Sequence, residues 1–320
     1  MNRKKICVVG GGYWGQNHIR TLNSLEVQVG IVENKIDQLK MLKKKFSNIK
    51  CYENLESSFK DGYEGYVVAT PSETHFKIAK KIINAKKPVL VEKPMALNVQ
   101  DAEKLVLLAQ KNNVNLMVGH VLLFHPAIMK IRSLISDGEI GDLQYIYSNR
   151  VNLGKVRLEE NVFWSLAPHD IAIFQYLTRS FPKSIQSKGS SFLQKGIADS
   201  TLTHLEYENN VKGHIFVSWL HPFKEHRLVV IGSKAMISFE DSTEGRPLKY
   251  YSKKFDFING VPKKKDGPVK LLSYEERMPL EEELKYFLKH LKNGKIQISN
   301  GEEGLDVVKI LSRASGQLLQ

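Results

Sequence analysis

The chain has little cysteine and no long apolar run. Cys7 and Cys51 are the two cysteines among 320 residues, and their separation matches no common metal-ligand spacing. They lie in apolar or strand-like stretches, which favours buried thiols over a disulfide scaffold. No apolar run approaches the roughly 20 residues that a transmembrane helix needs. The apolar stretch after the basic N-terminus is too short for a secretion signal, so we expect a cytoplasmic protein without membrane contact.

Acidic residues are scarce relative to basic ones. The chain has 47 Lys and Arg but 34 Asp and Glu, which gives a formal net charge of +13. The lysines are spread along the chain, and the short runs at 43–45 and 263–265 lack the interleaved aromatic residues of a nucleic-acid surface. We therefore expect no nucleic-acid partner and no metal site, whereas an anionic small substrate suits the positive charge.

Internal repeats are absent, and the length predicts two domains. Residues 1–120 alternate short apolar runs with helical patterns, which predicts an α/β domain with a doubly wound parallel sheet. Its strands are expected at 5–10, 27–32, 49–52, 66–70, 88–93 and 116–121, and its main helices at 13–25, 36–46, 71–85 and 101–113.

Residues 121–320 have a different pattern. Longer, alternating strands predict an α/β domain with a mostly antiparallel, open sheet. Hairpin turns are expected at 209–210 and 232–234, and a mobile loop at 244–270. The last helix could pack back on the first domain. Strands are expected at 143–153, 200–220 and 227–240, and helices at 125–141, 163–177, 281–293 and 302–316.

Gly10, Gly12 and Gly15 form the pattern G-x-G-x-x-G between the first strand and the first helix. The first glycine permits a tight turn, the second lets a pyrophosphate approach the backbone, and the third lets the helix pack on the strand. The helix N-terminus then offers free N–H groups to phosphate oxygens. We predict a dinucleotide site that includes Tyr13 and Trp14; a glycine-rich turn without a ligand is the alternative.

Glu33 ends the second predicted strand, where an acidic side chain binds both hydroxyls of the adenosine ribose. Its charge would repel a 2′-phosphate, so NAD is favoured over NADP. Lys35 nearby could offset part of that repulsion, and a solvated strand end is the alternative for Glu33.

Glu92 and Lys93 lie at the carboxyl end of the fifth predicted strand, the edge at which ligands bind in open α/β sheets. Burial favours the neutral amine of a lysine, which is the form that accepts a proton. On the dipeptide alone, a surface lysine before a turn proline explains the pattern better.

The motifs ATPSETH, EKPMALN and GHVLLFHP, placed after that glycine turn, resemble the Gfo/Idh/MocA oxidoreductase family. The resemblance extends along the whole chain and implies a Rossmann domain, a second α/β domain and a homo-oligomer, dimer or tetramer. It implies hydride transfer between NAD and a hydroxyl or keto carbon, usually of a sugar. It places Thr70, Pro71, His75 and Glu92 along the cofactor and Lys93 on the substrate hydroxyl, with a cis Lys93–Pro94 bond.

The segment FWSLAPHDIAI resembles the family stretch in which an aspartate precedes a histidine by four residues. His169 takes the histidine position and is the expected acid–base partner of Lys93. Ser165 takes the aspartate position and cannot be anionic. Either Lys93 and His169 suffice, or catalysis is weakened or altered. Without the resemblance, His169 would be interpreted as a core histidine.

The stretch 147–170 is similar to family members that act on nucleotide-linked sugars. This resemblance implies NAD-dependent oxidation of the 3-hydroxyl of UDP-N-acetylglucosamine, followed by a partner aminotransferase in lipid A or surface glycan (lipopolysaccharide) biosynthesis. Cations at 150, 155 and 157 would neutralise the diphosphate, although each residue could equally be a solvated strand residue. The candidate substrate residues are His125, Asn149, Arg150, Asn152, Arg157, Ser165 and Asp170.

Two alternatives stay open. One is a dehydrogenase or ketoreductase for another sugar or a cyclitol. The other is a sugar-sensing regulator that retains the cofactor but lacks the chemistry, for which Ser165 is the one supporting feature.

Overall fold

The computed structural model describes residues 3–292 and 294–318, which form two compact units. The first unit comprises Met1–Phe124 and Arg277–Lys309, and the second comprises His125–Glu276 and Ile310–Gln320. The first boundary lies four residues after the predicted domain change at residue 120. The segment 277–309, expected in the second domain, clusters with the first unit.

Six strands form the sheet of the first unit: β1 (Lys5–Val9), β2 (Gln28–Val32), β3 (Lys50–Tyr52), β4 (Gly65–Val68), β5 (Val89–Glu92) and β6 (Leu116–Gly119). Their order is β3-β2-β1-β4-β5-β6, and every pairing is parallel. The predicted doubly wound sheet is confirmed. Strands β4 and β6 are buried at every position, as expected for strands covered on both faces.

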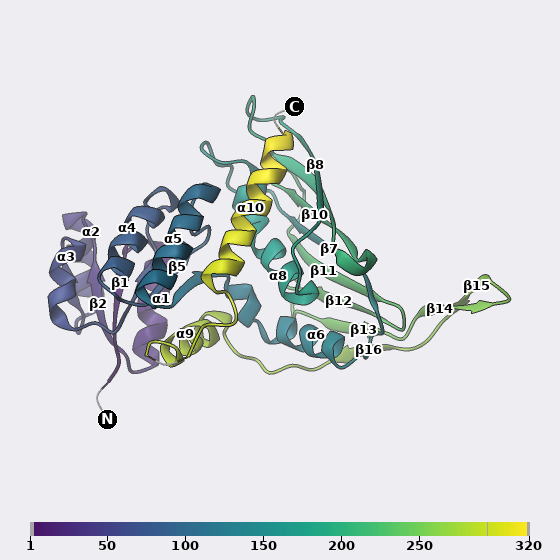
Figure 1. Cartoon of the computed structure of the whole chain (residues 1–320), viewed down its shortest axis with the longest axis horizontal. Helices are drawn as coiled ribbons and strands as arrows, with labels where there is room; N and C mark the ends of the chain where they lie inside the picture. Colours follow the sequence, from purple (N-terminus) through teal and green to yellow (C-terminus); the bar gives the residue numbers. More distant parts are fainter. Residues whose placement is uncertain (1–2, 293, 319–320) are drawn as a thin grey trace. The chain divides into compact units, whose positions relative to one another are not determined.

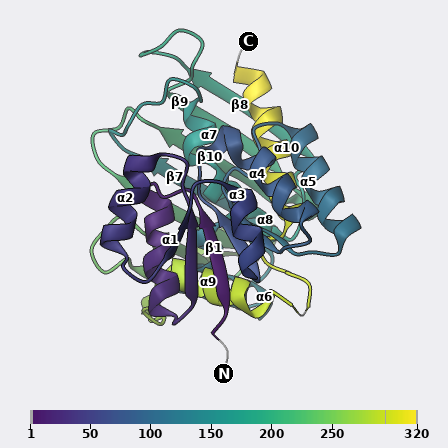
Figure 2. The ribbon, with the colours of Figure 1, turned by 90° about the vertical axis from the view of Figure 1, so that its left-hand side faces the viewer.

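Helices cover this sheet, and Figure 2 shows α1 and α2 to one side of β1 and α4 and α5 to the other. Asn98 caps α5 by accepting a hydrogen bond from the N–H of Asp101 at 2.8 Å, so of the two possible starts in the sequence, Asn98 and Asp101, the helix uses Asn98. The helices of this unit are α1 (Tyr13–Ser24), α2 (Ile36–Lys45), α3 (Leu55–Ser58), α4 (Ser72–Asn84), α5 (Val99–Asn112) and α9 (Pro279–Lys289), with short 3₁₀ turns η1 (Phe59–Asp61) and η2 (Val121–Phe124).

The second unit contains an eight-stranded sheet in the order β16-β13-β12-β11-β7-β10-β9-β8. The β7–β10 pairing is parallel and the other pairings are antiparallel, so the predicted sheet type is confirmed. The strands of this unit are β7 (Leu143–Val151), β8 (Ser184–Ser190), β9 (Ser200–Glu206), β10 (Lys212–Ser218), β11 (Glu225–Gly232), β12 (Met236–Glu240), β13 (Leu248–Tyr251), β14 (Lys254–Ile258), β15 (Val261–Lys265) and β16 (Val269–Leu272).

Three helices and one 3₁₀ turn complete the second unit: α6 (Pro126–Ser136), α7 (Val162–Leu166), α8 (Pro168–Thr178) and η3 (Glu208–Asn210). The single helix expected at 163–177 is two helices, because Pro168 begins α8 as its first residue. The last helix, α10 (Gly301–Leu318), begins in the first unit, and the division falls within it after Lys309.

The prediction of a mobile loop at 244–270 was wrong, because this segment forms strands. β13 pairs with β12 and β16, and β14 pairs with β15 as a hairpin that extends from the sheet (Figure 1). Asn259 and Gly260, both at positive φ, make the hairpin turn. Asn-Gly between strands is a strong hairpin signal, whereas the lysines and prolines around it are typical of a loop.

None of the helices in the described part of the chain has both the length and the apolar character needed to cross a membrane. Cys7 is buried, Cys51 is half-buried and both are free thiols. Burial raises the pKa of both, which keeps them in the protonated, unreactive form.

Candidate functional site

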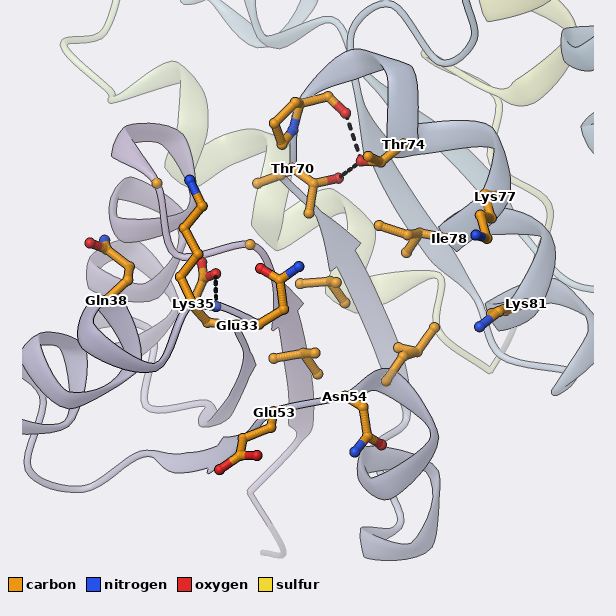
Figure 3. A pocket seen from close by; sticks show the side chains of 18 of the residues that line it. Glu33, Lys35, Gln38, Glu53, Asn54, Thr70, Thr74, Lys77, Ile78 and Lys81 are labelled. Atoms are coloured by element: carbon orange, nitrogen blue, oxygen red, sulfur yellow. Dashed lines mark hydrogen bonds between the residues drawn. The ribbon is translucent and has the colours of Figure 1, made fainter.

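A pocket of about 700 Å³ lies at the carboxyl ends of β1, β2 and β4 in the first unit. Its wall combines the glycine turn, the end of β2 and the first turns of α4. Figure 3 shows Glu33, Lys35 and Gln38 on one side and Thr70, Thr74 and Lys77 on another. This is the sheet edge at which the sequence predicted a dinucleotide.

Glycine is required at two positions of the turn. Gly10 has φ +97°, and a Cβ there would lie 2.8 Å from the carbonyl oxygen of Ala69. A Cβ on Gly15 would lie 1.9 Å from the carbonyl oxygen of Gly10, so α1 could not pack at its present distance. A Cβ on Gly12, by contrast, would meet no described atom within 4 Å. The open space over Gly12 fits the approach of a pyrophosphate.

The first turn of α1 is open to an anion. Gly12 precedes the helix, no side chain caps it and its first turn has no acidic residue. The N–H groups of this turn therefore meet no acidic side chain or cap from α1 itself, and the nearest described carboxylate, that of Glu33, accepts from the N–H of Gly11 instead. Tyr13 is 78% exposed and Trp14 is 46% exposed, so both aromatic rings border this helix end as accessible surfaces.

Glu33 is fixed by two backbone donors. The N–H of Gly11 donates to its Oε2 at 2.9 Å, and the N–H of Lys35 donates to its Oε1 at 2.9 Å. Gln38 donates in turn to the carbonyl oxygen of Gly11 at 2.8 Å. A carboxylate accepts about four hydrogen bonds, so Glu33 retains acceptor capacity for two ribose hydroxyls.

The turn after β4 is joined to the EKP segment through His75. Its Nε2 lies 2.8 Å from the carbonyl oxygen of Thr70, and its Nδ1 lies 2.8 Å from that of Pro94. Thr74 donates to the hydroxyl of Thr70 at 2.7 Å. His75 therefore holds the backbone at Thr70 and the backbone at Pro94 in place. The Lys93–Pro94 peptide bond is cis.

Lys93 follows β5 and is half-buried. Glu92 before it lies 2.7 Å from the Nε2 of His18 and accepts the backbone N–H of Lys93 at 3.3 Å. Burial raises the pKa of Glu92, but the hydrogen bond and charge of His18, with the charge of Lys93, outweigh burial and lower it. Glu92, the residue before Lys93, is therefore ionised at neutral pH.

Two further buried ionisable groups of the first unit, His120 and Glu283, were not singled out from the sequence. His120 follows β6 and is 2% exposed; burial, then the charge of Lys93, lowers its pKa to about 4. Glu283 on α9 is completely buried. The run Glu281–Glu283 favours a solvated face, but Glu283 lies three residues after Leu280 and four before Phe287, on the apolar face of α9.

In the second unit, Ser165 lies on α7 and His169 on the first turn of α8, both half-buried. Asp170 points to the sheet, where Nε and Nη2 of Arg150 donate to its two oxygens at 2.7 and 3.2 Å. The guanidinium expected to neutralise a diphosphate is therefore already paired inside this unit.

The other candidate substrate residues of the second unit lie in varied surroundings. His125 is 3% exposed and caps α6, its Nδ1 accepting the N–H of Ala127 at 3.1 Å. Asn149 donates to Glu225 at 2.8 Å. Asn152 is half-buried and Arg157 is exposed.

The described residues contain no group of three His, Cys, Asp or Glu that could bind a metal ion.

Comparison with known proteins gives the class. A family profile described as "Oxidoreductase family, NAD-binding Rossmann fold" matches residues 4–120, and one described as "GFO/IDH/MocA C-terminal domain" matches residues 128–238. The fold and the pocket are those of an NAD-binding oxidoreductase. Since the two profiles together cover more than two thirds of the 320 residues, the chain belongs to the Gfo/Idh/MocA family.

Relatives of known name match nearly the whole chain. UDP-N-acetylglucosamine 3-dehydrogenase of Acidithiobacillus ferrooxidans is 23% identical over 286 residues, which cover 88% of this chain and 86% of that one. A solved structure of that enzyme aligns with a TM-score of 0.87 at 20% identity, covering 100% and 98%. Myo-inositol 2-dehydrogenase of Thermotoga maritima is 24% identical over 316 residues, covering 94% and 92%.

A solved oxidoreductase of Agrobacterium radiobacter in complex with NAD+, L-tartaric acid and magnesium aligns with a TM-score of 0.82 at 18% identity, covering 99% and 96%. The open face over Gly12, the uncapped α1 and the fixed Glu33 fit the same cofactor here. The chain is thus an NAD-binding oxidoreductase of a family in which the relatives named above are sugar and polyol dehydrogenases.

Proposed function

We propose that the protein oxidises the 3-hydroxyl of a nucleotide-linked sugar, UDP-N-acetylglucosamine, to the 3-keto sugar. The observation on which the proposal depends is Lys93, a half-buried amine at the end of β5 in the same unit as the dinucleotide pocket. The near-complete alignment with UDP-N-acetylglucosamine 3-dehydrogenase of Acidithiobacillus ferrooxidans supports the choice of sugar.

The chemistry divides between cofactor and chain. NAD, when bound, supplies the hydride acceptor. Lys93 binds the 3-hydroxyl and takes its proton, and His169 is the second acid–base group of this proposal. Ser165 provides a neutral hydroxyl where the family pattern has a carboxylate, so it can hydrogen-bond but contributes no negative charge.

Glu33 supports the preference for NAD. Both of its oxygens are already held toward the pocket by backbone N–H groups, so the carboxylate cannot rotate away from a 2′-phosphate without losing two hydrogen bonds. Lys35, Lys77 and Lys81 also border the pocket and reduce the repulsion. Nζ of Lys81 lies 2.6 Å from Oε1 of Glu56, and this ion pair weakens the attraction of Lys81 for a 2′-phosphate.

The segment after β7 supports an anionic substrate. Lys155 and Arg157 are exposed there and are assigned to the two phosphates of the UDP group. Arg157 has an ion pair with Glu160 at 3.8 Å, but it is exposed, whereas the pair of Arg150 with Asp170 is buried. We further assign the keto product to a pyridoxal-phosphate aminotransferase in surface glycan synthesis. The protein is proposed to act in the cytoplasm as a homo-oligomer.

The test is NADH formation by the purified protein with NAD and a panel of UDP-sugars, dTDP-sugars, free hexoses and inositols. An aminotransferase is included to remove the keto product. UDP-N-acetylglucosamine should give the highest kcat/KM, and Lys93→Met should lower kcat by about 10²–10⁴-fold because proton transfer is lost. Lys111→Met, on the exposed side of α5, is the matched control.

Three outcomes would replace the proposal. Faster turnover of inositol or a free sugar would favour the cyclitol or sugar alternative, for which the myo-inositol 2-dehydrogenase relative is the supporting observation. Tight NAD binding without turnover of any substrate would favour the sensor. Wild-type rates in Lys93→Met would show that Lys93 takes no part in the chemistry. The change of kcat in Ser165→Asp measures how much rate is lost with serine at this position.

A further inference from the structure

Two loops of the second unit lie at the same end of its sheet. The segment 152–161 follows β7, the loop 191–199 joins β8 to β9, and the register of β7, β10, β9 and β8 brings both to one end. Single exposed apolar residues are ordinary, whereas several on one surface indicate that another molecule covers them. The large apolar side chains on these loops are Leu153, Leu158, Phe192 and Leu193, which are 79%, 76%, 74% and 50% exposed.

Hydrogen bonds join the two loops. Nε2 of Gln194 donates to the carbonyl oxygen of Arg157 at 2.9 Å, and the N–H of Val162, where α7 begins, donates to the carbonyl oxygen of Ala198 at 3.0 Å. Phe192 is two residues from Gln194, so their Cα atoms lie within about 8 Å of each other. Residues 152–161 and 191–199 therefore form one surface, the two-loop surface.

A buried carboxylate fixes the backbone of Phe192. Asp199 is 0% exposed, and its Oδ2 accepts the N–H groups of Phe192 and of Leu193, the second at 2.8 Å. The carbonyl oxygen of Asp199 in turn accepts the N–H of Trp219 at 2.9 Å, which ties the loop to the end of β10. The backbone at Phe192 is thus held while the ring stays exposed, and a ligand that covers the ring loses little entropy in ordering the loop.

Exposed cations lie beside these apolar side chains. Lys155 and Arg157 precede Leu158, and Lys195 occupies the turn of the other loop. Glu160 lies 3.8 Å from Arg157, but that pair is open to solvent, where an ion pair contributes little and a phosphate can compete for the guanidinium. A ligand that fits this surface has an anionic group next to a flat apolar face, and a nucleoside diphosphate has both.

We propose that the base of the nucleotide stacks on the ring of Phe192, with the diphosphate on the cations of the two-loop surface. This base site rests on the proposed function and deepens it. Phe192 is a specificity-determining residue, since it binds the base and not the reacting carbon. Every base has a π-face, so the ring selects a nucleotide-linked sugar over a free sugar and does not select uracil over thymine.

The first experiment measures binding without turnover. Calorimetric titrations of the full-length protein use UDP and inorganic pyrophosphate, with saturating NADH to fill the dinucleotide pocket. Phe192→Ala should weaken UDP by about tenfold, because base stacking is lost, and should leave pyrophosphate unchanged, because it has no base. Phe257→Ala is the matched control: Phe257 on β14 is 73% exposed and lies outside the two loops, so neither affinity should change.

Two further variants separate stacking from apolar covering. Phe192→Trp keeps an aromatic face and should keep the UDP affinity, whereas Phe192→Leu keeps an apolar side chain without a ring and should lose most of it. In turnover, Phe192→Ala should raise the KM for UDP-N-acetylglucosamine about tenfold while kcat changes by less than about twofold, because the base is bound equally in ground and transition states.

Unchanged UDP affinity in Phe192→Ala would overturn the base site. Equal losses of UDP and pyrophosphate would also overturn it, because they would indicate a displaced loop. A smaller oligomer in sedimentation with unchanged UDP affinity would assign the two-loop surface to a second copy of the chain. Wild-type UDP affinity in Phe192→Leu would refute stacking.

The outcomes separate the base site from the proposed function. Oxidation of UDP-N-acetylglucosamine by a Phe192→Ala variant with wild-type KM would refute the base site alone. If the wild-type protein oxidises no UDP-sugar, the proposed function fails, and the UDP titrations still decide whether the loop binds a base.

Discussion

The Arg150–Asp170 ion pair allows a quantitative prediction. Its side chains are 10% and 4% exposed and joined by two hydrogen bonds across β7 and α8. Removing one partner from such a pair costs about 3–5 kcal/mol, because the other charge stays buried. In Asp170→Ala, Asp241 and Glu240 still act on the Arg150 charge, so the lower end of this range, about 3 kcal/mol, is expected.

The double variant Arg150→Met with Asp170→Leu removes both charges and fills the space with apolar groups. Its stability should lie within about 1–2 kcal/mol of wild type or above it, since the desolvation of both ions disappears. The assay is urea unfolding followed by tryptophan fluorescence in a Trp14→Phe background, because Trp164 and Trp219 then report the second unit alone.

A second readout comes from His226, whose pKa is lowered to about 3 by burial first and then by the charge of Arg150. In the double variant this pKa should rise but stay below 6.5, because burial remains. Equal destabilisation of the single and double variants, or an unmoved His226 titration, would show that the pair does not stabilise this unit as a buried ion pair.

Three further predictions concern the first unit. Gly15→Ala should abolish NAD binding in calorimetry, because its Cβ would lie 1.9 Å from the Gly10 carbonyl oxygen. Glu33→Gln should weaken the binding of NAD and strengthen the binding of NADP. The ratio of the Kd for NADP to the Kd for NAD should fall by about 10-fold or more. The pKa of His120 is about 4 in the folded protein, against 6.5 for an unperturbed histidine. As the pH falls, the unfolded chain therefore takes up this proton first, and the free energy of unfolding decreases by about 3 kcal/mol between pH 6.5 and pH 4. His120→Leu should remove that slope in urea titrations at each pH.

The parallel sheet could be predicted from sequence because its signals are local. The strands are continuous apolar runs bounded by glycine, proline or polar residues, and Asn98 marks a helix start by its own side chain. The glycine turn and Glu33 were found in the same way, as a short pattern between a strand and a helix. The roles assigned to Lys93 and His169 depend on the family resemblance and stay predictions.

What the sequence did not reveal depends on contacts between distant segments. Arg150 looked available for a phosphate because its partner Asp170 lies 20 residues further on, on a helix that crosses the strand. Strand β13 has a lysine in its centre and becomes a strand only because β12 and β16 pair with it on both sides.

Glu283 illustrates the same point in the first unit. Helix α9 has an apolar face with Leu284, Phe287 and Leu288 buried, and its packing against α1 and η2 buries Glu283 on that same face. The helix lies about 160 residues beyond β6 in the chain, yet it belongs to the first unit. A leucine at this position would bury apolar surface without any desolvation cost, whereas a buried acid costs several kcal/mol unless it is neutral. Burial, and then the negative charge of Glu92, raises the pKa of Glu283 well above its usual range, so position 283 holds a neutral acid and not a buried charge.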